Sequence, residues 1–107
     1  MLPKKNRVNT KEVDKIFKEG RFLVSSSFTF KYFKSANKGV KISFIAPKSV
    51  AKLAVKRNLL RRRGYTALAK YIDQFPAGLM GVFIFKKYQD DISIIKDEIK
   101  NIFKKIN

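Results

Sequence analysis

The chain has 107 residues, of which 45% are hydrophobic, including ten Phe and four Tyr, so residues 1–107 are expected to form a single domain around one core. Lys and Arg number 25 against 8 Asp and Glu, and the formal net charge of +17 favours a polyanionic partner. Because the sequence contains neither His nor Cys, it excludes disulfides and nucleophilic catalysis of the Ser/His or Cys/His type.

The first predicted element is a helix over residues 9–20. Asn9 is a typical N-terminal cap, and Glu12 stands three residues later, where its side chain can bind a free backbone amide. Gly20 is a typical stop. The apolar stripe of this helix consists of Val13, Ile16 and Phe17.

Two strands are predicted next, over residues 28–33 and 40–46. The first alternates, so that Phe28, Phe30 and Tyr32 share one face and Lys31 lies on the other. Asn37, Lys38 and Gly39 form a turn signal, and Pro47 ends the second strand. The short connection predicts an antiparallel hairpin.

A long helix is predicted over residues 50–72, with Ser49 as its cap. Gly64 lies on its apolar side, which indicates a close approach to the sheet. The apolar positions on this side are Leu53, Leu60, Ala67, Leu68 and Tyr71.

The last two elements are a strand over residues 80–85 and a final helix opened by Asp90 and Asp91. The strand is almost wholly apolar, as expected of a strand covered on both faces and parallel to the strand before the long helix. The helix places Asp97 and Glu98 on its polar side. Its apolar stripe is Ile92, Ile95, Ile99, Ile102 and Ile106. The predicted fold is therefore α+β, in the order α-β-β-α-β-α, with a mixed sheet of about four strands.

The long helix carries the strongest functional signal. From Gly20 to Ile72 the chain has thirteen basic residues and no Asp or Glu. Such crowding of like charges destabilises an isolated helix and favours an external polyanion such as RNA. Arg57 lies at the edge of the apolar stripe, and either its stem packs on the core or its guanidinium binds a phosphate or partner. The cluster comprises Lys48, Lys52, Lys56, Arg57, Arg61, Arg62 and Arg63.

Acidic residues offer little to an active site. The adjacent pairs are Asp90–Asp91, expected at a helix start, and Asp97–Glu98, expected on a polar helix face. This pattern does not supply the inward-facing carboxylates of a two-metal nuclease, so no metal site and no catalytic residue are predicted in the chain. No glycine-rich phosphate loop is present either.

Residues 47–62, PKSVAKLAVKRNLLRR, resemble the signature helix of the protein component of bacterial ribonuclease P. Lys4, Lys5, Asn6, Arg7 and Val8 resemble the basic N-terminal arm of that family, and residues 82–87 resemble its late apolar strand, which ends in basic residues. Val13, Phe17 and Gly20 resemble its first helix. The chain departs from the family pattern at Val13, Leu59 and Tyr65, where Phe, Arg and Arg are usual.

The resemblance implies a two-layer α/β sandwich of the ribonuclease P protein and ribosomal-protein type. It also implies a partnership with a catalytic RNA, which holds Mg²⁺ and cuts precursor tRNA at the mature 5′ end. The residues that would grip the catalytic RNA are Lys52, Lys56, Arg57, Asn58, Arg61, Arg62 and Arg63. The residues that would hold the 5′ leader of precursor tRNA are Val13, Phe17, Lys31, Lys48 and Lys86.

Several alternatives stay open from the sequence. Phe17 can equally be an ordinary core residue. The chain as a whole can be a structural RNA-binding protein of ribosomal type, a binder of DNA or membrane surfaces, or a stand-alone nuclease. Since the N-terminal charges precede no apolar run and the longest apolar runs are too short to cross a bilayer, a cytoplasmic protein without a membrane partner is expected. Its self-repelling charge favours a monomer without an obligate protein partner.

Overall fold

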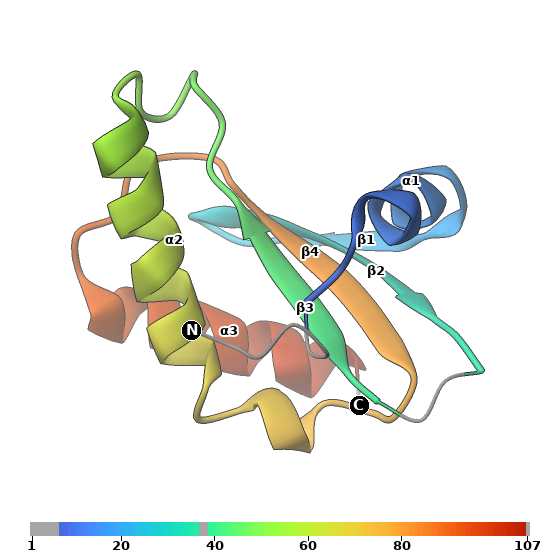
Figure 1. Ribbon diagram of the computed structural model, residues 1–107. Coiled ribbons are helices and arrows are strands. Elements are labelled where there is room, and N and C mark those ends of the chain that lie inside the picture. Colours follow the sequence, from blue (N-terminus) through green and yellow to red (C-terminus); the bar gives the residue numbers. More distant parts are fainter. Residues whose placement is uncertain (1–6, 37–38, 107) are drawn as a thin grey trace.

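A four-stranded mixed sheet forms the centre of the computed structural model, which describes residues 7–36 and 39–106 (Figure 1). The strands are β1 (Arg21–Val24), β2 (Phe28–Lys34), β3 (Lys41–Ile45) and β4 (Leu79–Phe85), in the spatial order β1-β2-β4-β3. The helices are α1 (Thr10–Glu19), α2 (Ala54–Leu68) and α3 (Ile92–Ile106), and a short 3₁₀ turn spans Ile72–Gln74. Helix α1 lies on one face of the sheet, and α2 and α3 lie on the other (Figure 1).

The predicted hairpin between the strands at residues 28–33 and 40–46 is wrong. Strand β4 lies between β2 and β3, antiparallel to the first and parallel to the second, so that Phe83 is paired with both Phe30 and Phe44. The parallel pairing across α2 is thus confirmed. Every β4 residue except Ile84 is buried, and a strand this apolar loses the most water-exposed surface at the centre of the sheet. Of the predicted turn, Asn37 and Lys38 lie outside the described residues.

Strand β1 is an addition to the predicted order, which is observed as α-β-β-β-α-β-α. It has four residues, of which only Leu23 packs against the core, so it is too short for its periodicity to predict a strand. The predicted α+β class and four-stranded mixed sheet are confirmed. The two-layer arrangement holds for the main core, which lies between the sheet and the pair α2 and α3.

Aromatic rings dominate the inner face of the sheet, which we define as the face toward α2 and α3. The Phe83 ring lies 4.3 Å from the Phe30 ring and 4.9 Å from the Phe44 ring, measured between centroids. The predicted stripe of α3 is confirmed, since its central isoleucines are buried against these rings and its terminal ones pack at the margin. Within the described residues no helix has both the length and the apolarity needed to cross a bilayer.

Helix α2 is shorter than predicted at both ends. It begins at Ala54, after Leu53, and Ser49 does not cap it. The chain before it turns instead, because the backbone amides of Val50 and Ala51 both donate to the Pro47 carbonyl. Leu53 was expected in the core, but its side chain is 62% exposed. At the other end, Leu68 closes the helix and the chain turns into the 3₁₀ segment.

Glu98 corrects a further expectation, because it does not lie on the polar side of α3. Its side chain is buried, and its Oε1 accepts hydrogen bonds from the Ser25 hydroxyl at 2.7 Å and the Ser27 backbone amide at 2.6 Å. The turn between β1 and β2 packs against α3, and a buried amide needs an acceptor there. Helical periodicity could not reveal this use, since it reports only local spacing.

The predicted first helix is confirmed in detail. Asn9 and Glu12 exchange hydrogen bonds between side chain and backbone, and the Gly20 amide binds the Ile16 carbonyl. Ile16 is buried with Met80 and Val82 in a second, smaller cluster on the outer face of the sheet, which we define as the face that α1 touches. Helix α1 is therefore seated on the sheet by this single buried side chain and its partly buried neighbours.

Candidate nucleic-acid interface

The outer face of the sheet is only partly covered by α1. The helix lies over Met80, Val82 and Phe33, toward the end of the sheet where β4 begins. Beyond it the outward-facing side chains are half-buried. Ile45 and Ile84 pack at the margin of the smaller cluster, and the Ser43 hydroxyl accepts a hydrogen bond from the Val8 amide at 2.8 Å. We call this surface the open sheet face. It consists of Thr29, Lys31, Ser43, Ile45 and Ile84.

Phe17 and Lys31 meet at the border between α1 and the open sheet face. The Lys31 Nζ lies 4.5 Å from the centre of the Phe17 ring, and the Phe17 side chain is 46% exposed. The interpretation of Phe17 as a core residue is therefore wrong. Lys15 makes a similar contact with Phe33, at 4.9 Å. An exposed ring beside an ammonium group, as at Phe17, offers stacking for unpaired bases and charge for phosphates.

An ion pair holds α1 in place. Glu12 Oε2 and Lys41 Nζ, on β3, are 3.0 Å apart, and the Glu12 side chain is 16% exposed. Burial alone would raise the pKa of Glu12, but the hydrogen bond from the Asn9 amide and the charge and hydrogen bond of Lys41 outweigh it, so the pKa is lowered. The ionised pair fixes the helix, and with it Phe17, relative to the sheet.

The other predicted leader residues frame this surface. Lys48 and Lys86 follow the carboxyl ends of the parallel strands β3 and β4, so both lie at the same edge of the sheet, away from α1. Both are exposed, and the Lys86 Nζ donates to the Ser25 carbonyl at 3.1 Å. Val13 is half-buried in the smaller cluster at the base of α1. The structure thus distributes these residues around the open sheet face instead of gathering them at one point.

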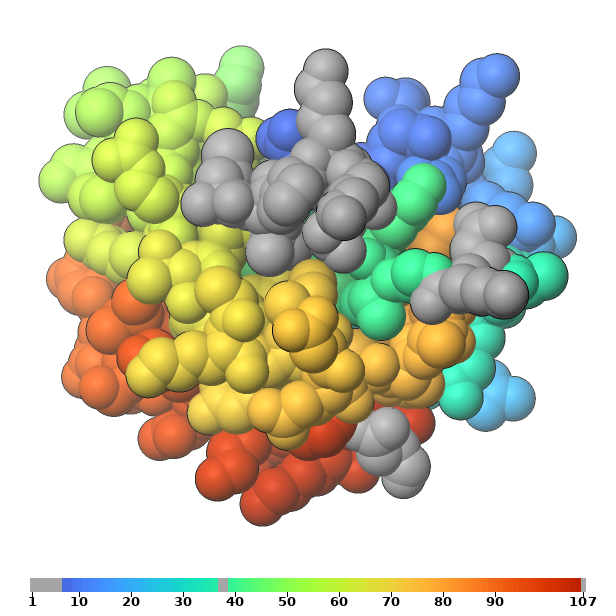
Figure 2. Space-filling model, turned by 60° about the horizontal axis from the view of Figure 1, so that its bottom comes forward, coloured from blue at the N-terminus to red at the C-terminus, as the bar shows by residue number. Residues whose placement is uncertain are grey.

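Helix α2 presents a basic surface to solvent. Lys56, Arg61 and Arg62 are exposed on the helix, and Lys52 is exposed just before it. The Arg61 guanidinium donates to the Asn58 side-chain oxygen, which orients both groups. In Figure 2 the green to yellow surface of α2 adjoins the orange to red surface of α3, and the blue surface of α1 lies on the opposite side of that view.

Two other arginines of α2 are engaged within the protein. Arg57 donates from one guanidinium nitrogen to the carbonyls of Ala51, at 3.0 Å, and Lys52, at 2.7 Å. Arg63 lies 3.3 Å from the Asp90 carboxylate and 5.6 Å from the centre of the Tyr88 ring. Arg57 thus closes the turn before the helix, and Arg63 ties α2 to the start of α3. The sequence predicted that Arg57 and Arg63 bind RNA, but it could not show that each also has partners within the chain.

A hollow of about 580 Å³ joins the two predicted sets of residues. It lies between the segment before α1, the start of α1, β3 and α2. Arg61 lines it from α2 and Val13 from α1, and its other walls include Arg7, Ser43 and Ile45. The hollow therefore lies between the open sheet face and the basic surface of α2.

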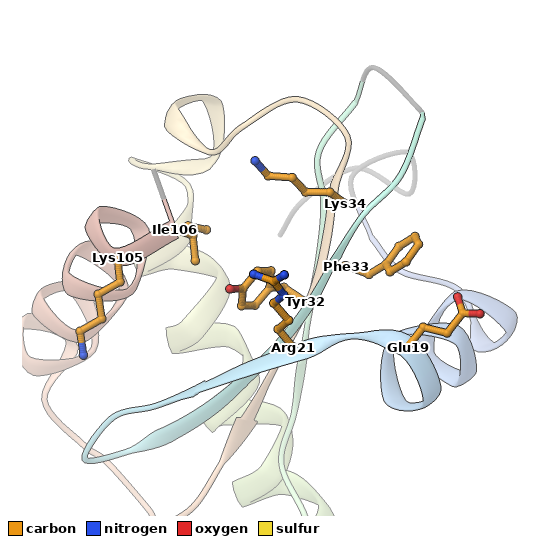
Figure 3. A pocket seen from close by; sticks show the side chains of 7 residues that line it. All are labelled: Glu19, Arg21, Tyr32, Phe33, Lys34, Lys105 and Ile106. Carbon is orange, nitrogen blue, oxygen red and sulfur yellow. The ribbon is translucent and has the colours of Figure 1, made fainter.

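A second hollow, of about 490 Å³, lies at the end of β2 (Figure 3). Glu19 and Phe33 border it on the α1 side of the strand, and Lys105 on the α3 side (Figure 3). Arg21 and Tyr32 lie between them (Figure 3). These charged groups spread around the strand and do not converge on one point, so they form no acid–base pair.

A model of the family named Ribonuclease P matches residues 2–107, almost the whole chain. The chain belongs to the ribonuclease P protein family. Ribonuclease P proteins of known structure share its fold. The protein from Thermotoga maritima superposes with a TM-score of 0.83 at 21% identity, covering 94% of this chain and 97% of that one. The protein from Staphylococcus aureus gives 0.82 at 15% identity, covering 95% and 98%. No curated protein sequence matches significantly.

Membership accounts for the basic surface. A ribonuclease P protein works with an RNA subunit in an endoribonuclease of tRNA processing, and the exposed cations of α2 are suited to bind RNA. The sequence-based recognition is thus confirmed by the family match and the shared fold. The role of each residue in this ribonuclease P protein stays a prediction.

Proposed function

We propose that this chain binds the catalytic RNA of ribonuclease P with α2 and holds the 5′ leader of precursor tRNA on the open sheet face. The observation that carries the proposal is the exposed Phe17 ring with Lys31 at its face, at the border of the open sheet face. A leader is unpaired, so its bases are free to stack and its phosphates are free to meet lysines.

The proposal places the chemistry in the RNA subunit. The chain has no His or Cys, and among residues 7–36 and 39–106 no three acidic side chains come together in a way that could hold a metal ion. We therefore assign Mg²⁺ to the RNA and its substrate. The protein's contribution is to bind and orient, which strengthens the complex with precursor tRNA and supports cleavage at moderate Mg²⁺.

On α2 the predicted contacts divide into two kinds. Lys52, Lys56, Arg61 and Arg62 are exposed and suited to meet phosphates directly, with Asn58 positioned by Arg61. Arg57 and Arg63 bind RNA less directly, because each already has partners in the chain. Their main role is to hold the basic surface in shape.

On the open sheet face the predicted contacts form a track. Phe17 stacks on a base, Lys31 pairs with a phosphate, and Val13, which is half-buried on α1, lines the leader site beside them. Lys48 and Lys86 bind the RNA leader at the edge of the sheet that lies away from α1. A track of this kind binds leaders of any sequence, since every base has a π-face and every nucleotide has a phosphate.

Reconstitution tests the proposal. The protein is added to its cognate RNA subunit at moderate Mg²⁺, and cleavage of precursor tRNA is measured, with sedimentation reporting whether the protein is a monomer. We expect stimulation by the protein and no cleavage by the protein alone. A folded protein that gives no stimulation, or that cleaves without RNA, contradicts the proposal. Affinity for RNA should also fall steeply as salt rises.

A further inference from the structure

The edge strand β1 presents two exposed apolar side chains. Phe22 is 65% exposed and Val24 is 50% exposed, whereas Leu23 between them packs against the main core. Since neighbouring residues of a strand point to opposite faces, Phe22 and Val24 share one face. Phe22 is paired with Lys31 and Val24 with Thr29, so both belong to the same face as the open sheet face.

Phe22 therefore widens the open sheet face by one strand. Lys31 has an aromatic residue on each side, Phe17 under its Nζ on α1 and Phe22 at the paired position on β1. Phe22 belongs to neither core cluster of the described residues, so its exposure is not explained by packing. An exposed aromatic ring that the core does not use indicates an interaction surface.

The surroundings of Phe22 select the kind of partner. Strands β1, β2 and β3 contain no Asp or Glu, while Lys31 is paired with Phe22 and Lys86 binds the turn that follows β1. Strands that combine rings with cations and carry no carboxylate are complementary to unpaired RNA. A second copy of the chain fits this surface poorly, because the formal net charge of +17 opposes self-association.

We propose that Phe22 is a second stacking position for the leader, so that neighbouring bases stack on Phe17 and Phe22 and their linking phosphate binds Lys31. In the free protein the Lys31 ammonium lies over the Phe17 ring. A phosphate bound between the Phe17 and Phe22 rings attracts the Lys31 ammonium away from Phe17. The Phe17 ring is then free to stack on a base. The inference rests on the proposed function of the open sheet face and adds a residue to it.

A tryptophan at position 22 gives a direct test, because the chain contains no Trp and the new indole is the only one. Holoenzyme carrying Phe22→Trp is titrated with precursor tRNA that has a long unpaired leader and with mature tRNA that has none. We expect quenching of the indole fluorescence by the precursor alone. Ile94→Trp is the matched control, since Ile94 is 42% exposed on α3, which covers the other face. Its fluorescence should not depend on the leader.

Affinity provides the second readout. Phe22→Ala should weaken binding of the long-leader precursor by roughly 5- to 100-fold and leave mature tRNA unchanged, while Phe22→Trp stays close to the unmodified holoenzyme. If the unmodified holoenzyme prefers the leader and Phe22→Ala keeps that preference in full, the role of Phe22 is overturned and the proposed function stands. If the unmodified holoenzyme has no leader preference, the proposed function fails as well. If Phe22→Ala changes only the sedimentation of the protein, β1 is a contact between copies and the inference is wrong.

Discussion

Gly64 of α2 lies against the aromatic ring of Phe44 on β3. A Cβ atom built on Gly64 would be 2.6 Å from two carbons of that ring, far inside van der Waals contact. The Phe44 ring cannot easily give way, because it is buried and stacked on Phe83. The predicted close approach of this helix to the sheet is thus confirmed, and it is the absence of a side chain that permits it.

Gly64→Ala should therefore destabilise the protein. Replacing Gly with Ala stabilises a helix by about 1 kcal/mol. Overpacking against Phe44 costs about 1–3 kcal/mol, so over most of this range the cost exceeds the gain. Urea unfolding followed by circular dichroism measures the difference. Gly39→Ala is the control, since a Cβ at Gly39 would meet nothing within 4 Å. Equal stabilities for Gly64→Ala and the unmodified protein would contradict the packing argument.

Glu98 provides a second stability test. Removing its carboxylate with Glu98→Ala leaves the buried Ser27 amide without its acceptor and should lower the free energy of unfolding by about 2–4 kcal/mol. Glu98→Gln retains an acceptor oxygen and should cost less. The exposed neighbour Asp97 offers a matched control, and Asp97→Asn should change the unfolding free energy by less than about 0.5 kcal/mol. If Glu98→Ala and Asp97→Asn changed the unfolding free energy by the same small amount, Glu98 would not anchor the turn between β1 and β2.

The spacing of residues in the sequence predicted the features that depend on interactions between near neighbours in the chain. The cap of α1, the stripe of α3 and the buried strand β4 all follow from spacing and composition, and all are confirmed. The errors arose where distant segments compete. Strand β4 displaced the expected hairpin because its pairing partners are chosen by total burial, and Glu98 was recruited by a turn more than seventy residues away.

The interface followed the same division. Charge and spacing on α2 predicted a basic RNA-binding surface, but they could not show that Arg57 and Arg63 have partners within the chain. Phe22 was missed because β1 is too short to be recognised, so the face of its side chains was unknown. A signal was nevertheless present in the sequence, since an aromatic residue in a short segment without carboxylates stands next to Arg21.

Replacing Arg57 and replacing Arg62 should have different effects on RNA affinity and on stability. Arg62→Ala should weaken binding to the RNA subunit by about 1–3 kcal/mol with little change in stability, because its guanidinium is exposed. Arg57→Ala should also lower stability, since the carbonyls of Ala51 and Lys52 lose their donor. Filter binding and urea unfolding measure the two quantities. Lys104→Ala, a distant exposed lysine, is the control, and losses of RNA affinity no larger than its own would argue against a special role for either arginine.

The ion pair of Glu12 and Lys41 predicts a specific acid response. The pKa of Glu12 is lowered in the folded protein. The contribution of the ion pair to stability is therefore fully present above the ordinary pKa of 4.5, and it is lost as the pH falls through the lower pKa of the folded state. Glu12→Gln should reduce stability by about 1 kcal/mol at neutral pH, and its difference from the unmodified protein should shrink across that acid range. A double-mutant cycle with Lys41→Gln isolates the coupling of the two side chains. Because the pair seats α1, the same substitution should weaken binding of leader-bearing precursor tRNA. A stability difference that stays constant from pH 7 to below the folded pKa would mean that the charge of Glu12 does not hold the helix.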